Sequence, residues 1–520
     1  MKIQNSINTQ IIPQNNRKQE FTGAIDASVA FLRFLDTNKA WGATAVDLGC
    51  MVFPRTITDF TRNPKAGMET ARREGSGTAN HAAIGLVYGP LAGMIMGQAV
   101  NSKFDGINAR KIYADADTVD ILGKYHFDVI KNSGANAQKY AEELADNITT
   151  KEGKGLSKEG KSLFTKHLTK IIGENKTPSK EDTKIIKSIL LSDLGDEENI
   201  ILKNSEKTIK TRLDDLAGNI TNFSHALFKD KVIDSFKNAN MFKDVSFVNA
   251  MKKFGVRRSL LGLGIASAIG ASVQPMNIYL TKKKTGTDGF VGVDGRQKDN
   301  SLGFKVLKTL SAAAFATFAI LTIGNPKNII KNIQYRGITP TIEQFKLVYG
   351  LTIASRFLVA RDKDELRESA IKDIIGFSTW LIFGNFVSKG TIRLIDKIKG
   401  TKLAGRTRDE LLYENIKKLG LSDKIIQDGK AVSFRKLLPF VDKATRKNMR
   451  YLSVAQLAGY AFSGLVLGIG IPKLNIFMTN KREATRKAQL TESNSIENML
   501  KPENMAFLSS NMNFGQKFNN

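Results

Sequence analysis

The residues of this chain that could do chemistry are a few polar side chains set inside apolar stretches. Asp47 lies within AWGATAVDLGCMVF and is the one acidic residue deep in such a stretch. A carboxylate inside a membrane is a functional candidate by default, and Arg55 is its nearest cation in the sequence. An interfacial helix with Asp47 facing water explains the pattern equally well. Asn277 and Asn475 are the other polar candidates, because each follows a proline near the end of an apolar run.

Two pairs of charged residues could close polar links between apolar segments. Arg55 precedes Glu69, and Arg356 precedes Glu368 at nearly the same separation. Opposite charges can hold such a link together, and we expect both ion pairs to be structural rather than catalytic.

Signatures of catalysis and of cofactor binding are missing from the sequence. KKTGTDGF at 283–290 is similar to the phosphorylation loop of P-type ATPases, but Lys283 stands where that family needs an aspartate nucleophile. The chain has no GxxxxGK[ST] phosphate-binding loop. Its histidines have no Cys or His partner at metal-ligand spacing. We therefore predict no enzyme activity, no cofactor and no metal site.

Glycine recurs at every fourth position of AIGLVYGPLAGMIMGQAV. These residues are Gly85, Gly89, Gly93 and Gly97, and the spacing puts them on one helical stripe. Such a stripe lets another backbone approach closely, which is how helices associate in lipid. It indicates a helix partner or a homo-oligomer. A glycine-rich loop around Pro90 is the alternative.

Long runs of the chain carry few or no charged residues, and a membrane-spanning helix needs about 20 mostly apolar residues. Shorter apolar stretches at 40–54 and 347–355 are candidate half-buried or interfacial helices. Gly, Ala and Ser dilute Leu and Ile in the long runs, so a soluble bundle with these runs as its core is the alternative. The runs are 75–102, 259–281, 309–326, 374–388 and 451–480, the last interrupted by Lys473.

Three short phrases occur twice in the same order. This order predicts a duplicated unit with apolar helices, an insertion and a closing apolar helix, against the alternative of chance similarity. The matched phrases are LGCMVFPR (48–55) with YGLTIASR (349–356), ETARRE (69–74) with ESAIKD (368–373), and PMNIYLTKKK (275–284) with PKLNIFMTNK (472–481).

Pro275 and Pro472 stand at matching places in the last phrase. Either the run turns back at the proline as a re-entrant segment, or the proline ends a helix at the membrane interface. We favour the second, with Asn277 and Asn475 as helix caps.

The fold class that follows is all-α, a multi-pass helical membrane protein with a two-copy internal repeat and polar helical insertions. Apolar residues at spacings of three and four predict helical insertions, and without alternation no sheet is expected. We predict a disordered N-terminal tail at 1–25, early helices of a first unit at 26–101, a polar insertion at 102–258, a closing helix at 259–284, a linker at 285–300, early helices of a second unit at 301–389, a basic insertion at 390–450, a closing helix at 451–484 and a mobile C-terminal tail at 485–520.

The formal net charge of +28 requires an anionic neighbourhood. We expect an anionic phospholipid membrane, of the bacterial cytoplasmic type, as this partner. Nucleic acid is disfavoured because the cations are spread along the chain and aromatic residues make up only 8% of it. A single cysteine, Cys50, excludes an internal disulfide, and the N-terminal region carries no cleavable signal peptide.

The sequence therefore predicts an integral membrane protein with a non-enzymatic structural or interaction role. A transporter of small solutes or ions that uses the repeat interface is the first alternative. A soluble, basic helical protein that binds nucleic acid is the second.

Overall fold

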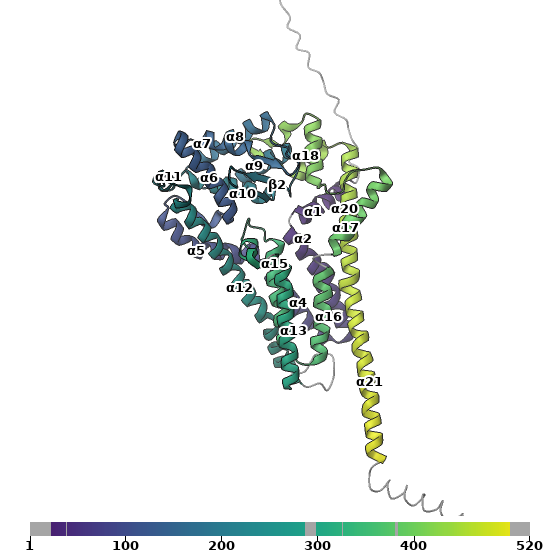
Figure 1. Cartoon of the computed structure of the whole chain (residues 1–520). Coiled ribbons are helices and arrows are strands. Elements are labelled where there is room, and N and C mark those ends of the chain that lie inside the picture. Colours follow the sequence, from purple (N-terminus) through teal and green to yellow (C-terminus); the bar gives the residue numbers. More distant parts are fainter. Residues whose placement is uncertain (1–21, 38, 287–297, 325, 380–382, 500–520) are drawn as a thin grey trace, which may run out of the picture.

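The computed structural model describes residues 22–37, 39–286, 298–324, 326–379 and 383–499. These residues are mostly helical, as predicted. Long helices form a bundle in one half of the molecule, and a globular domain covers one end of it (Figure 1).

The bundle contains the apolar runs of the sequence. Four of its helical stretches, Pro64–Lys103, Ser246–Lys284, Leu302–Leu321 and Lys443–Arg482, are long and apolar enough to cross a membrane. Its helices are α2 (Lys39–Val46), η1 (Asp47–Val52), α3 (Phe53–Arg62), α4 (Pro64–Ala83), η2 (Ile84–Tyr88), α5 (Gly89–Lys103), α12 (Ser246–Thr285), α13 (Leu302–Leu321), α15 (Ile342–Leu358), α16 (Lys363–Ser378), α17 (Gly384–Lys399), α20 (Lys443–Ser463), η9 (Gly464–Gly470) and α21 (Ile471–Met499).

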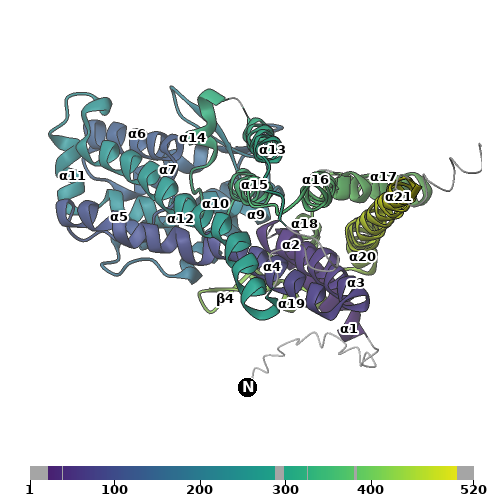
Figure 2. The ribbon, with the colours of Figure 1, turned by 90° about the horizontal axis from the view of Figure 1, so that it is seen from below.

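The helices of the two predicted units exchange contacts across the bundle. The closing helix α12 packs against α15, and the closing segment η9 packs against η1 and α3. Figure 2, seen from below, places α4 between α12 and α3. Within 41–54 buried and exposed residues are mixed, as predicted for a half-buried helix, and 347–355 is mostly buried among these helices.

Small residues allow these close approaches. A Cβ atom added to Gly468 would lie 2.8 Å from Cβ of Pro54, and one added to Gly270 would lie 3.0 Å from Nδ2 of Asn80 and closer still to Thr352. Both distances are shorter than van der Waals contact, so a larger side chain at either glycine would push two helices apart.

Neither proline ends a helix or turns the chain back. Pro275 lies inside α12, and Pro472 is the second residue of α21, which continues from the π-helical η9. Both readings offered for these prolines are therefore wrong. A wider π-helical turn leaves room before Pro472, and in α12 the neighbouring helices hold the segment helical despite the lost hydrogen bond.

The two insertions fold together into one globular domain with a shared hydrophobic core. In that core α18 of the second insertion packs against α9 of the first. The domain's helices are α6 (Ala116–Ser133), α7 (Ala137–Asp146), α8 (Lys158–Gly173), α9 (Lys180–Leu194), α10 (Leu213–Leu227), α11 (Asp230–Lys237), α18 (Arg408–Lys418) and α19 (Phe434–Leu437).

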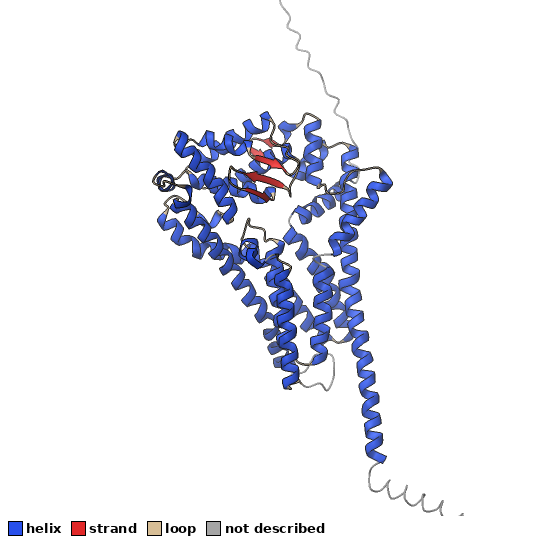
Figure 3. Cartoon of the chain, in the orientation of Figure 1, coloured by secondary structure: helices blue, strands red, loops and turns tan. Residues whose placement is uncertain are grey.

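The prediction that no sheet forms is wrong, because this domain contains antiparallel strands (Figure 3). One sheet has the order β1 (Ile148–Thr150), β2 (Ile200–Lys203), β3 (Thr208–Thr211), and β4 (Ile426–Gln427) pairs with β5 (Lys430–Ala431). Strands of two to four residues are too short to show alternation. Asp428 and Gly429 turn the second hairpin with positive φ angles, a signal that the sequence did carry.

The predicted tails and linker fall only partly on described residues. Helix α1 (Thr22–Thr37) begins within the predicted N-terminal tail, and α21 continues to Met499 where a mobile tail was expected. The sequence from 485 to 499 contains neither proline nor glycine, so nothing in it stops the helix. Residues 1–21, 287–297 and 500–520 lie outside the described residues.

Candidate functional site

The bundle carries charged side chains inside and apolar side chains outside. Its outer faces expose large apolar residues such as Leu310 (64% exposed), Phe386 (66%) and Phe477 (64%). Within the described globular domain, at 104–245 and 400–442, the exposed large apolar residues are Leu163, Met241, Leu419 and Phe440. The buried ionisable residues of the bundle include Asp47, Arg55, Glu69, Glu74, Arg258, Arg356, Arg361, Glu365, Lys372 and Asp373.

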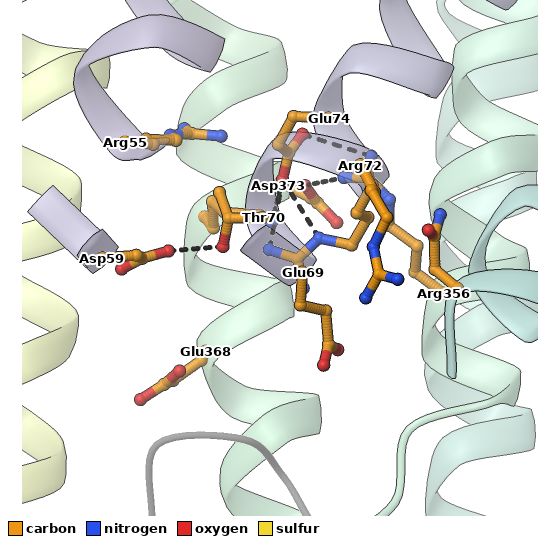
Figure 4. A network of polar contacts seen from close by, with 12 residues as sticks. Arg55, Asp59, Glu69, Thr70, Arg72, Glu74, Arg356, Glu368 and Asp373 are labelled. Atoms are coloured by element: carbon orange, nitrogen blue, oxygen red, sulfur yellow. Dashed lines mark hydrogen bonds and ion pairs between the residues drawn. The ribbon is translucent and has the colours of Figure 1, made fainter. Parts of the chain in front are cut away.

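Glu74 on α4 is the centre of this interior (Figure 4). Its carboxylate pairs with Lys372 at 2.7 Å, Arg73 at 3.2 Å and Arg356 at 3.3 Å. Arg356 on α15 also binds Asp373 of α16 at 2.9 Å. The network thus ties helices of the first unit to helices of the second, and its burial makes each charge dependent on the others.

Asp47 lies next to this network. It is 6% exposed, and its carboxylate accepts a hydrogen bond of 2.5 Å from Oγ1 of Thr78. The alternative in which Asp47 faces water from an interfacial helix is therefore wrong. Arg55 and Arg356 are both within its electrostatic reach.

The two predicted ion pairs are wrong. Glu69 binds Arg361 at 3.0 Å, in the turn between α15 and α16, instead of Arg55. Glu368 accepts a hydrogen bond from Thr479 instead of pairing with Arg356. All four residues lie in the bundle, as their spacing in the sequence indicated. Their observed partners include residues of the other unit (Glu69 with Arg361, Arg356 with Glu74) and of the closing segments (Arg55 with Leu467, Glu368 with Thr479).

Arg55 stands out among the buried cations. It is 3% exposed, and its Nε donates to the backbone oxygen of Leu467 at 3.1 Å. Its Nη1 and Nη2 have no hydrogen-bond partner among the described residues. Arg55 lines a cavity of about 90 Å³ between α3, α4, α16 and the start of α21.

The two asparagines do not cap helices. Asn277 is buried, and its Nδ2 donates to the backbone oxygen of Val273 within α12 at 2.9 Å. Asn475 donates from Nδ2 to the backbone oxygen of Glu368 at 3.2 Å. Because each helix continues past its proline, neither asparagine meets a free helix end.

Two threonines four residues beyond these asparagines make matching contacts. Thr281 accepts a hydrogen bond of 2.9 Å from Arg72 on α4, and Thr479 accepts one of 3.0 Å from Arg367 on α16. Each closing helix is therefore bonded to the helix that follows the polar link of its own half.

The glycine stripe is filled from within the chain. Gly85 contacts Ile338 and Pro340, Gly89 lies against Tyr335, and a Cβ at Gly93 would be 2.9 Å from Cζ of Arg258. Gly97 faces Ala109, Arg110 and Phe254. The stripe does permit a close approach, but the partner is this chain, so we do not propose an oligomer through it.

The side chain of Arg258 explains why position 93 is a glycine. This fully buried side chain crosses from α12 to α5, donating to the backbone oxygens of Gly89 at 3.0 Å and Ile112 at 2.9 Å. Its guanidinium carbon also lies 3.5 Å from the ring centroid of Tyr113. The space left by Gly93 is what lets Arg258 reach these acceptors.

A second buried cluster lies outside the bundle, where α1 meets the globular domain. Arg33 of α1 binds Asp409 of α18 through contacts of 2.6 to 3.0 Å. Burial alone would raise the pKa of Asp409, but Arg33 and Lys187 outweigh it and hold that pKa below its usual range. Burial, with the neighbouring Asp409, raises the pKa of Glu197 well above its usual range.

Sequence reasoning missed Glu74, Lys372 and Asp373. A signal was present, because Glu74 aligns with Asp373 in the matched phrases ETARRE and ESAIKD, and Arg73 aligns with Lys372. Charged residues retained at matching places beside apolar runs could have been read as a buried network.

No known family model matches this sequence, and neither curated proteins nor solved structures give a significant match.

Proposed function

We propose that this chain is an integral, multi-pass membrane protein with a non-enzymatic structural or interaction role at an anionic membrane. The observation that carries the proposal is the bundle's polarity, with ionisable residues inside and large apolar residues outside. Water would leave that apolar exterior unfavourably exposed, whereas lipid would accommodate it.

The course of the chain supports a topology in which both insertions lie on one side of the membrane. In Figure 1, α12 and α20 with α21 run away from the globular domain, while α5 reaches it. The proposed crossings are α2–α3, α4–α5, α12, α13, α15, α16–α17 and α20–α21.

We also propose that the two halves of the bundle are copies of one unit. The matching hydrogen bonds at Thr281 and Thr479 support this relation. So do Gly270 and Gly468, which lie at the same offset from those threonines. Each meets the matched phrase of the other half, Gly270 at Thr352 and Gly468 at Cys50 and Pro54. Parallel repeats of this kind are known in membrane proteins and place their shared interface near the middle of the bilayer.

A groove of about 570 Å³ supports contact with anionic headgroups. It is lined by Pro90 and Met94 of α5 and by polar residues. Its cations outnumber its carboxylates, namely Arg110, Lys111, Lys180, Lys184 and Arg336 against Asp214 and Asp215. Apolar residues together with a surplus of cations are the chemistry that an anionic phospholipid requires.

Membrane embedding is tested by washing membranes with alkaline carbonate. We expect the protein to stay in the membrane pellet and to be released only by detergent, because its apolar exterior needs lipid or a substitute for it. Release into the carbonate wash would refute the proposal and would favour the alternative of a soluble protein that binds nucleic acid. A peripheral protein that the wash releases serves as the control.

The groove is tested by substituting Arg110→Gln with Lys180→Gln. Both side chains are exposed and neither makes an ion pair in the described structure. In lipid nanodiscs we expect phosphatidylglycerol to stabilise the wild type more than the variant, by up to about 1 kcal/mol per cation removed. Thermal unfolding with and without the anionic lipid measures this difference.

Lys151→Gln with Lys166→Gln, at exposed positions outside the groove, is the matched control because it removes the same number of charges. An equal loss of lipid response in this control would show that only the total charge matters.

A further inference from the structure

We propose that the groove beside α5 selects phosphate esters of polyols, with Asp215 and Asn219 as the residues that recognise the hydroxyl groups of the ligand. The inference rests on the proposed function, because it specifies which anionic headgroup the groove prefers. Cations alone would accept any phosphate, so a selective site also needs acceptors for the rest of the headgroup.

Asp215 is the feature that calls for a ligand. The residue lines the groove and is 7% exposed, yet its carboxylate makes no hydrogen bond or ion pair with the described residues. Neither oxygen is sealed off from water. Gly337, which also lines the groove, leaves room for this carboxylate, because a Cβ atom there would collide with Oδ1. A buried carboxylate without a donor is costly, and a ligand hydroxyl is a donor that would satisfy it.

The acceptors lie on one face of α10. Residues of this helix line the groove at spacings of three and four, which places them on one side of it, namely Asp215, Gly218, Asn219 and Asn222. Asn219 is buried, and its Nδ2 donates to the backbone oxygen of Arg336 at 3.1 Å, so its Oδ1 remains available as an acceptor. A Cβ atom at Gly218 would meet no atom within 4 Å, so the groove is open at this point.

Most charges that line the groove already have partners. The pairs are Arg336 with Asp115 at 3.0 Å, Lys184 with Glu181 at 3.0 Å and Asp214 with Lys187 at 2.7 Å. Arg110 and Lys180 make no ion pair among the described residues, and Lys111 donates to the backbone oxygen of Pro178. These three cations therefore remain for a phosphate group, against the single carboxylate of Asp215.

Hydroxyl groups suit Asp215 better than an ammonium group does. Arg212 and Arg336 are within its electrostatic reach and would repel an ammonium group. Burial raises the pKa of Asp215 to about 6, so at neutral pH the carboxylate is mainly ionised and accepts hydrogen bonds from hydroxyl groups.

Apolar residues of α5 favour a lipid as the source of the ester. Leu91 and Ile95 are exposed and follow the lining residues Pro90 and Met94 directly in the sequence. Acyl chains can cover these side chains while the phosphate meets the cations of the groove.

The test is calorimetric titration of the full chain in a neutral detergent with two short-chain lipids. Dihexanoyl phosphatidylglycerol carries a polyol headgroup, and dihexanoyl phosphatidylethanol has the same charge but no hydroxyl group. We expect the wild type to bind the glycerol lipid about 10-fold more tightly, because only that lipid can donate hydrogen bonds to the carboxylate.

Three variants locate this preference. Asp215→Ala should abolish it and keep the binding of phosphatidylethanol, because the cations remain. Gly218→Leu, which fills the groove without changing any charge, should weaken the binding of both lipids. Asp234→Ala, at an exposed position of α11 outside the groove, is the matched control for a lost carboxylate.

Each outcome decides the proposal. A preference for the glycerol lipid that Asp215→Ala loses and Asp234→Ala keeps supports it. Equal binding of the two lipids to the wild type, or tighter binding of dihexanoyl phosphatidylserine, would refute hydroxyl recognition and leave the contact with anionic headgroups standing. Failure of the wild type to bind either lipid would refute both. If Asp215→Ala does not fold, the comparison of the two lipids on the wild type and on Gly218→Leu decides.

Competition by soluble phosphates identifies the source of the ester. Glycerol 1-phosphate that displaces the glycerol lipid at equal concentration would support the polyol class and point to a soluble ester. Weak displacement, together with a clear preference between the two lipids, would support a membrane lipid. Inorganic phosphate that displaces the glycerol lipid as well as glycerol 1-phosphate does would refute recognition of the polyol.

Discussion

Glu74→Gln is expected to destabilise the bundle by about 3–5 kcal/mol, because the buried Arg356 and Lys372 and the half-buried Arg73 would lose their shared counter-charge. A loss of this size is a large fraction of the total stability of most proteins. The thermal midpoint of the detergent-solubilised chain, followed by loss of the monodisperse peak in size-exclusion chromatography, measures the effect.

A second substitution separates charge imbalance from a packing defect. Glu74→Gln combined with Lys372→Met removes one cation as well, and we expect it to recover part of the lost stability. Glu152→Gln, at an exposed position in the turn after β1, should leave the midpoint unchanged. If the double variant is no more stable than Glu74→Gln alone, the charge-balance account of the network is wrong.

Glu410→Gln is expected to make the globular domain more stable at neutral and alkaline pH. Burial raises the pKa of Glu410 to about 7, from an ordinary value of 4.5. Because the folded-state pKa is raised, the carboxyl's contribution to stability is present below 4.5 and is lost as pH rises through about 7. Gln stays neutral throughout and can still accept the 2.8 Å hydrogen bond from the backbone of Thr407.

The variant and the wild type should therefore be equally stable near pH 4.5 and differ by up to about 3 kcal/mol near pH 8. Thermal unfolding of both proteins across this pH range measures the difference in their stability. The titration of all other groups is the same in both proteins and drops out of that difference. Asp423→Asn at an exposed position is the control and should give no such trend. A constant difference between Glu410→Gln and the wild type at every pH would contradict the assigned pKa.

The helical part of the fold could be predicted from the sequence because its signals are local. Long apolar runs and the glycine spacing identified the bundle helices, whose periodicity does not depend on distant residues. The short strands could not be predicted in the same way. β2 and β3 have four residues each. β2 forms because the shared core of the two insertions buries its Ile200 and Leu202, and β3, which has no buried residue, pairs along its edge.

The residues of the candidate site were predicted, but their partners were not. Asp47, Arg55, Glu69, Arg356 and Glu368 all lie in or beside the charged interior. Reasoning from the matched phrases paired each arginine with the glutamate that opens the next phrase, Arg55 with Glu69 and Arg356 with Glu368. In the folded chain the partner is chosen by which helices pack together, and contacts between the two halves bring distant charges closer than sequence neighbours.

By itself, the sequence determined that this protein consists mainly of long apolar helices with charged residues at repeated places, since composition and periodicity are properties of single segments. Only the tertiary structure decided which charges meet, that the glycine stripe is filled from within, and that Arg55 forms no ion pair with any carboxylate of the described residues. The physical reason is that an ion pair is fixed by distance in space, and a buried charge must find its partner among the side chains that packing brings to it.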